Sequence, residues 1–264
     1  MSEFLKVIVM SVIQGLTEFL PVSSSGHLAL AKHFLGLESP GASLELFLHG
    51  GTLLSVIIFY RRKLLSLIGG VLKFERSSLL YALWVLLSMV PAGILYAIGG
   101  DELEKTYDSP LFVSGMICVT GALLLSLFVI TGRAERKRSF GWSDALLMGL
   151  AQAIAMLPGI SRSGSTIAIG RFAGVKPAEA AEFSFIMSLP VIGGAVMMDV
   201  LKDGVAVSGL STASCVVGAI VAGLVGLAAI GTLVKILNKG KFWMFGVYCL
   251  VVGATSMLLI SMGY

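Results

Sequence analysis

QGLTEFLPVSSSGH at residues 14–27 and QAIAMLPGISRSGS at residues 152–165 share one pattern, which repeats at an offset of 138 positions. In each stretch a proline stops an apolar helical segment, a Ser/Gly turn follows, and a second helical segment begins. The offset aligns a glutamine, two serines and a glycine of the first stretch with the same residue types in the second. Paired broken helices in corresponding positions of two halves of a membrane protein point to a binding site. We therefore expect the site where the two turns meet.

The composition is that of an integral membrane protein. Of the 264 residues, 56% are hydrophobic and only 13% are charged, and the mean hydropathy is +0.95. A soluble domain carries about 25% charged residues. Apolar segments are spread along the whole chain, so the sequence predicts one membrane-embedded bundle and excludes a soluble domain of useful size.

Six apolar stretches between charged breaks are long enough to cross about 30 Å of hydrocarbon. The predicted crossings are 44–60, 78–99, 110–131, 179–198, 212–234 and 242–262. Two further segments, 4–36 and 142–173, are interrupted by the Pro/Ser/Gly turns, and we expect them to form re-entrant hairpins whose turns are buried in protein. The predicted fold class is an all-α polytopic membrane protein with about six transmembrane helices and two re-entrant helical hairpins.

The basic residues predict the orientation in the membrane. If the 60–77 loop is cytoplasmic, 14 of the 19 Lys and Arg lie on the cytoplasmic side, and both termini lie outside. A hairpin followed by three crossings in each half then predicts an inverted-topology repeat. We expect a single membrane domain, 1–264, with halves at about 1–131 and 142–264 joined by a basic cytoplasmic loop, 132–141.

Glu18, His27 and Arg162 are the residues whose burial in apolar segments needs a reason. An ionised side chain at bilayer depth costs roughly 2.5–3.5 kcal/mol on insertion scales, and it marks a functional site by default. Two helix N-termini, several hydroxyls and one arginine predict an anion site, above all for phosphate. Glu18 and His27 add a metal ligand or base and a proton donor, which indicates a reaction. Two alternatives stay open: Glu18 and Arg162 neutralise one another, or His27 is a hydrogen-bonded core histidine.

The turns and the helices that follow them supply the remaining candidates. Hydroxyls and backbone N–H groups are expected to bind phosphate at Ser23, Ser25, Gly26, Ser161, Ser163, Gly164 and Thr166. Serine and glycine in membrane helices also mark close packing, which is the alternative for each of them. Glu45, His49 and Glu182 are candidates for a layer of groups that supports the site from behind, and otherwise for helix packing.

Both stretches strongly resemble the motifs of the undecaprenyl-diphosphate phosphatase family, also known as the bacitracin-resistance proteins. The family is marked by Glu/Gln-x-x-x-Glu, here Gln14 to Glu18, by FLPVSSSGH, here 19–27, and by Pro-Gly-x-Ser-Arg-Ser-Gly-x-Thr, here 158–166. The resemblance covers essentially the whole chain. It implies a hydrolase of the bacterial inner membrane that removes the terminal phosphate of undecaprenyl diphosphate at an outward-facing site. This reaction recycles the lipid carrier for peptidoglycan synthesis, and bacitracin competes for the substrate.

The resemblance also implies a divalent cation and roles for individual residues. We expect Mg²⁺ or Ca²⁺ to be held by Glu18, with Gln14 at a position where many members carry glutamate. Arg162 is expected to hold the diphosphate, and His27 to protonate the leaving phosphate or to activate the attacking group. Ser24, which aligns with Arg162 at the offset, is the first candidate for the nucleophile. Attack by His27 or by water stays open.

A transporter is the main rival class. Inverted repeats with broken helices are typical of secondary transporters, and a lipid-phosphate flippase or anion transporter would use the same turns. Gln14, Glu18 and His27 favour the phosphatase, because anion transport gains little from a carboxylate beside the anion. The expected partners are a polyprenyl diphosphate and membrane lipids. Nucleic acid is not expected, and a homodimer is left open.

Overall fold

The computed structural model describes residues 2–35, 42–130, 140–203 and 211–263, and every regular element among them is helical. In chain order the helices are α1 (Glu3–Phe19), α2 (Ser24–Leu35), α3 (Ala42–Phe59), α4 (Arg61–Leu72), α5 (Arg76–Lys105), the short 3-10 helix η1 (Thr106–Asp108), α6 (Pro110–Ile130), α7 (Trp142–Ile154), α8 (Arg162–Phe172), α9 (Pro177–Asp203), α10 (Thr212–Asn238) and α11 (Trp243–Ser261). The predicted all-α fold is confirmed. Most of the basic loop predicted at 132–141 lies outside the described residues.

Five of the described helices are long and apolar enough to cross a membrane: α5, α6, α9, α10 and α11. They correspond to five of the six predicted crossings. The sixth prediction, 44–60, falls on α3, whose apolar part Leu44–Phe59 is shorter than the 18 residues of a full candidate span. The chain is therefore a multi-pass helical membrane protein.

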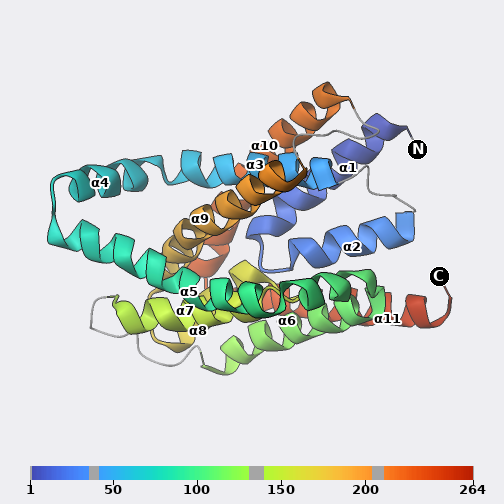
Figure 1. The fold of residues 1–264 in the computed structure, drawn as a ribbon. Helices are drawn as coiled ribbons and strands as arrows, with labels where there is room; N and C mark the ends of the chain where they lie inside the picture. Colours follow the sequence, from blue (N-terminus) through green and yellow to red (C-terminus); the bar gives the residue numbers. More distant parts are fainter. Residues whose placement is uncertain (1, 36–41, 131–139, 204–210, 264) are drawn as a thin grey trace.

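The 60–77 segment, predicted to be a loop, is mostly helical. Its basic residues suggested a connection between crossings, but Leu65, Ile68 and Leu72 repeat at helical spacing and form one exposed apolar face of α4. α4 folds back onto α5. Figure 1 places α4 at one end of the molecule and both ends of the chain at the other.

Helix packing in the bundle depends on small residues. A Cβ on Gly121 of α6 would lie only 2.8 Å from the carbonyl oxygen of Gly246 of α11, and a Cβ on Gly246 would lie 2.9 Å from the carbonyl oxygen of Gly121. Lipid does not drive apolar helix surfaces together, so close backbone approach and van der Waals contact must hold such pairs. A larger residue at either glycine would force α6 and α11 apart.

Each hairpin packs against a long helix of the opposite half. α1 lies along α10, and α7 lies along α5, while α3 contacts α9 and α6 contacts α11. A two-fold exchange of the halves would require these pairings. The inverted repeat itself stays a prediction. The pairings bring the turn between α1 and α2 next to the turn between α7 and α8 in the middle of the molecule (Figure 1).

Candidate active site

The first turn contains a serine in the left-handed backbone region. Ser23, between α1 and α2, has a φ of 72°, which residues other than glycine adopt rarely and often at functional sites. Its Oγ accepts a hydrogen bond from the N–H of Gly26 at 3.2 Å, and its carbonyl oxygen accepts one from the N–H of His27 at 3.1 Å. The start of α2 is therefore capped by Ser23, while Ser24, Ser25 and His27 stay half-buried.

The second turn repeats this capping. Ser161 is the N-cap of α8, and its Oγ accepts a hydrogen bond from the N–H of Gly164 at 3.1 Å. Gly159 has a φ of 93°, and a Cβ there would lie 2.3 Å from a backbone oxygen of α6, so only glycine fits. The repeat seen in the sequence therefore extends to the hydrogen bonds of the turns.

Thr120 of α6 fixes the second turn from outside the hairpin. Its Oγ1 donates to the carbonyl oxygen of Gly159 at 3.0 Å and accepts from the N–H of Ser161 at 3.0 Å. The side chain is fully buried. No signal within the motif could have found Thr120, because it lies 39 and 41 positions away from its two partners.

Replacing Thr120 by valine keeps the shape of the side chain but removes both hydrogen bonds. The buried N–H of Ser161 and the carbonyl of Gly159 then lose their partner, which costs about 1–3 kcal/mol. We expect the thermal unfolding midpoint of the detergent-purified protein to fall by roughly 4–8 °C. Thr120→Ser retains the hydroxyl and serves as the control. A valine variant as stable as the serine variant would contradict the role given to this hydroxyl.

The two turns contact each other directly. The Oγ of Ser163 donates to the carbonyl oxygen of Leu20 at 3.3 Å. On the other side of the contact, a Cβ on Gly26 would lie 3.1 Å from the Cα of Gly159. The structure therefore brings together the two segments that the sequence pattern paired.

Glu18 lies at the centre of this contact. Its carboxylate is buried, and Oε1 accepts a hydrogen bond from Nη2 of Arg162 at 2.5 Å. Oε2 accepts from Oγ of Ser24 at 2.7 Å and from Nε2 of Gln14 at 3.2 Å. One carboxylate thus joins the end of α1 to the starts of α2 and α8. The ion pair expected as an alternative exists, but it is one part of a larger arrangement that includes a hydroxyl.

Arg162 keeps unused donor capacity. Its side chain is 17% exposed, and its Nη1 is buried with no hydrogen-bond partner among the described residues. A guanidinium carries five N–H donors and accepts nothing, and an unpaired buried donor costs about 1–3 kcal/mol. A bound anion would provide the missing acceptor at the N-terminus of α8, where the helix dipole also favours negative charge.

His27 is held by two partners. Its Nδ1 lies 2.8 Å from the carbonyl oxygen of Ser23, and because a carbonyl only accepts, Nδ1 must carry the hydrogen. Its Nε2 lies 2.9 Å from the hydroxyl of Tyr248 of α11, and the two rings are stacked at 5.6 Å with an interplanar angle of 7°. Tyr248 was missed in the sequence, since it lies 221 positions from His27 in an ordinary apolar run.

The hydroxyl side chains predicted to bind phosphate differ in their exposure to solvent. Ser25 is half-buried. The side chains of Ser161, Ser163 and Thr166 are buried, and Thr166 shares a 2.6 Å hydrogen bond with Ser184 of α9. The buried side chains shape the second turn, so we expect α8 to contact an anion through its N–H groups and Arg162.

Of the three residues predicted to support the site, the structure places only some near the turns. His49 is close enough to Glu18 for an electrostatic interaction, and its Nδ1 lies 2.8 Å from the carbonyl oxygen of Glu45. The carboxylate of Glu45 is paired with Lys32 of α2. The structure does not bring Glu182 to the turns, because its carboxylate pairs with Lys63 of α4 at 2.8 Å.

The donor set around Glu18 fits a cation shared with a phosphate better than a metal site built by protein alone. Within the described ranges, no group of three or more His, Cys, Asp or Glu side chains could hold a metal ion. However, Oε1 of Gln14, one helical turn from Glu18, is buried and has no hydrogen-bond partner in the part of the chain that the structure describes. Oxygen donors of this kind suit Mg²⁺, which commonly takes one or two protein ligands and completes its shell with water and substrate phosphate.

The fold and the site define a class: multi-pass helical membrane proteins in which two helical hairpins place a carboxylate, an arginine and a serine at one point. Comparison with known proteins identifies the family. Residues 7–255 match the family described as bacitracin resistance protein BacA, and the chain belongs to this family. The resemblance seen in the two motifs is thereby confirmed.

Curated relatives cover nearly the whole chain. A protein from Bacteroides fragilis named undecaprenyl-diphosphatase is 37% identical over 262 residues, covering 97% of this chain and 98% of the relative. A protein of the same name from Desulfatibacillum aliphaticivorans is 36% identical over 269 residues, covering 96% and 97%. A third, from Halothermothrix orenii, is 37% identical over 259 residues, covering 97% and 98%.

Proposed function

We propose that this chain hydrolyses undecaprenyl diphosphate to undecaprenyl phosphate and inorganic phosphate, the activity that gives its curated relatives their name. One observation carries the proposal. The two oxygens of Glu18 bind the hydroxyl of Ser24 and the guanidinium of Arg162, while Nη1 of that guanidinium finds no hydrogen-bond partner among the residues described. A nucleophile, a base and an anion-binding group therefore meet at one point, which anion transport alone would not need.

Arg162 and the starts of α2 and α8 bind the diphosphate in this proposal. Unpartnered Nη1 of Arg162 donates to an oxygen of the terminal phosphate, and N–H groups of the two helices donate to others. These donors are fixed before the substrate arrives, because Ser23 and Ser161 cap the helices. Fixed donors stabilise the charge that develops on the phosphate oxygens in the transition state.

Ser24 is the proposed nucleophile and Glu18 its base. Oγ of Ser24 attacks the terminal phosphorus, and its proton passes to Oε2 of Glu18, 2.7 Å away. The bond from that phosphorus to the bridging oxygen breaks, and protonated His27 gives a proton to the departing undecaprenyl phosphate. Water then attacks the phosphorus of the phosphoserine and gives a proton to His27. The bond from that phosphorus to Oγ of Ser24 breaks, and Glu18 returns to this oxygen the proton that it took in the first step. Phosphate is released and each group regains its starting state.

We also propose that Glu18, with Oε1 of Gln14, holds Mg²⁺ or Ca²⁺ together with the substrate. Such an ion would neutralise charge on the diphosphate oxygens. Oε1 of Gln14, which is buried with no partner among the described side chains and backbone groups, supports this. The small number of protein oxygens favours Mg²⁺ over Ca²⁺.

The proposed location is the bacterial inner membrane, with both termini and the reaction site on the periplasmic side. The excess of Lys and Arg near the α4 end supports this orientation, and the chain ends lie opposite α4 (Figure 1). The polyprenyl tail would then lie among membrane lipids and helices, and bacitracin would compete for the diphosphate outside. A homodimer stays a prediction.

Phosphate release from undecaprenyl diphosphate by the detergent-purified protein tests the proposal. We expect steady release by the wild type and a loss of about 10²–10⁴-fold in Glu18→Gln, because the amide keeps the shape but cannot accept the proton of Ser24. Glu102→Gln is the matched control, since Glu102 is an exposed carboxylate whose side chain is 78% accessible and pairs with Lys105.

The assay is repeated after chelation and after return of Mg²⁺ or Ca²⁺. Loss of release with chelator and recovery with cation would support the metal proposal, whereas unchanged release would overturn it without affecting the role of Glu18. No release by folded wild type under any cation would overturn the phosphatase, and lipid-phosphate transport through the same turns would then become the leading function.

A further inference from the structure

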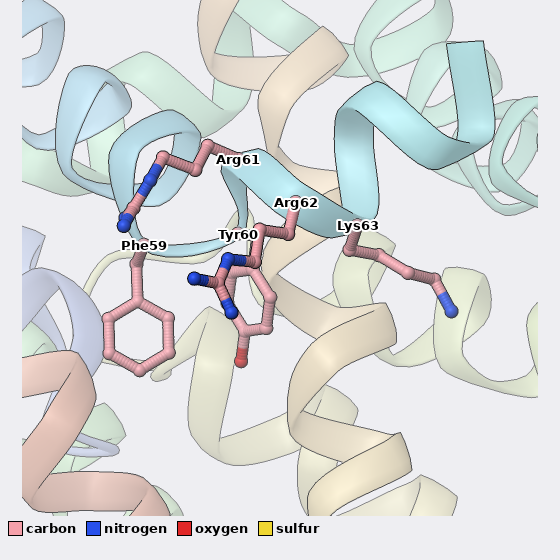
Figure 2. Close-up of a pocket in the computed structure, with 5 residues that line it drawn as sticks. All are labelled: Phe59, Tyr60, Arg61, Arg62 and Lys63. Atoms are coloured by element: carbon pink, nitrogen blue, oxygen red, sulfur yellow. The ribbon is translucent and has the colours of Figure 1, made fainter. Parts of the chain in front are cut away.

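A cavity of about 470 Å³ lies at the junction of α3 and α4, away from the turns. Its lining is five consecutive residues, Phe59, Tyr60, Arg61, Arg62 and Lys63, drawn in Figure 2. The ring of Phe185 lies between the rings of Tyr60 and Phe19, at 6.1 and 5.6 Å. Since Phe19 is next to Glu18 in α1, packed aromatic rings separate the cavity from the candidate active site. The proposed phosphatase reaction does not use this cavity.

The cavity concentrates positive charge at a helix N-terminus. α4 begins with Arg61, Arg62 and Lys63, has no acidic residue in its first turn, and its N-cap Tyr60 makes no side-chain capping bond. Cations are unfavourable at this end of a helix, where the free N–H groups and the dipole already carry positive charge. The local sequence thus opposes helix stability unless an anion is present to balance it.

The three cationic side chains differ in whether they already have hydrogen-bond or ion-pair partners. Arg61 donates to the carbonyl oxygen of Ile58 at 2.9 Å, and Lys63 pairs with Glu182 at 2.8 Å. Among the described residues, no hydrogen bond or ion pair engages the guanidinium of Arg62. Figure 2 shows Lys63 pointing away from Arg61. Arg62 is therefore the free anion-binding group of the cavity.

The surfaces on either side of the cavity are apolar. In α3, Leu54, Ile57 and Ile58 are 56%, 40% and 47% exposed, and in α4 Leu65 and Leu72 are 69% and 74% exposed. These side chains would contact lipid tails in a membrane. Tyr60, with an apolar ring and a polar hydroxyl, is typical of the boundary between hydrocarbon and headgroups. The cavity thus combines phosphate-binding groups with an apolar border at headgroup depth.

We propose that this cavity binds the phosphate of an anionic glycerophospholipid from the leaflet at the α4 end, with Arg62 as its principal ligand. The acyl chains lie along the exposed apolar side chains of α3 and α4. The phosphate accepts hydrogen bonds from Arg62 and from the free N–H groups at the start of α4. In the proposed orientation this is the cytoplasmic leaflet, which attracts basic segments through its anionic lipids.

Native mass spectrometry of the full detergent-purified chain, titrated with dioleoyl phosphatidylglycerol, tests the proposal. We expect one saturable site whose Kd rises about tenfold in Arg62→Gln, as loss of a charged hydrogen bond implies. Arg76→Gln is the matched control, an exposed arginine at the start of α5 that does not line the cavity, and we expect its Kd to stay within about twofold. Phosphate release from undecaprenyl diphosphate should be unchanged in Arg62→Gln, which separates this site from the active site.

Four results would overturn the proposal. Equal binding by wild type and Arg62→Gln would show that the lipid binds elsewhere, and equal losses in Arg62→Gln and Arg76→Gln would show general charge attraction. Dioleoyl phosphatidylcholine binding as tightly as phosphatidylglycerol would remove the requirement for an anionic headgroup. Inorganic phosphate that displaces the lipid at a similar concentration would identify free phosphate as the ligand.

Discussion

Arg162→Lys is expected to lower kcat for phosphate release from undecaprenyl diphosphate by about 10²–10³-fold, although the positive charge is retained. In the structure, Nη2 of Arg162 binds Glu18 at 2.5 Å, while the buried Nη1 has no partner within the described ranges. A guanidinium can bind the carboxylate through Nη2 and the phosphate through Nη1 at the same time. A lysine ammonium is a single point charge and cannot bind both in this geometry. Rates measured over a range of substrate concentrations in detergent would give kcat and KM separately.

The control for this experiment lies on the same helix. Arg171 of α8 donates to the carbonyl oxygen of Val175 at 2.7 Å, and Arg171→Lys should leave kcat within about threefold if the loss at Arg162 reflects transition-state binding. Equal thermal midpoints of the two variants would exclude unfolding as the cause. A lysine at position 162 that retains most of the wild-type kcat would show that charge alone is enough.

The two turns, and the contact between them, could be predicted because the residues that mark each turn are close together in the sequence. Proline, glycine and serine stop and restart helices at fixed positions, and Glu18 and Arg162 stand out against apolar neighbours. The repeat at 138 positions adds an expectation of pairing that no single segment contains. The structure then shows Glu18 bound to Arg162 and the turns in contact.

The groups that hold the turns could not be predicted, because they come from distant helices without a pattern of their own. Thr120 and Tyr248 sit in apolar crossings and gain their roles from the packing of α6 and α11. Glu182 was predicted to support the turns, but the structure pairs it with a residue from another helix. Its place in the second half resembles that of Glu45, but α4, which was predicted as a loop, brings Lys63 to it instead.

Ser24→Ala is expected to reduce kcat by at least about 10³-fold, and to abolish a phosphoserine intermediate that the wild type forms. The reason is the 2.7 Å hydrogen bond from its hydroxyl to Glu18, which orients the oxygen and provides a base for its proton. The measurement is rapid acid quench after mixing the enzyme with undecaprenyl diphosphate, followed by mass spectrometry of the peptide that contains 23–27. A phosphate on Ser24 before the first turnover is complete would identify the nucleophile.

Ser25→Ala is the informative companion, because the neighbouring hydroxyl is also half-buried in the same turn but makes no hydrogen bond to Glu18 in the structure. We expect it to raise KM more than it lowers kcat, and to leave phosphorylation of Ser24 in place. The pair of variants therefore separates a hydroxyl that reacts from one that binds. If Ser24→Ala still turned over within about tenfold of the wild type and no phosphoserine formed, water would be the attacking group. Glu18 would then act on that water directly, and Ser24 would serve only to hold the carboxylate between the two turns.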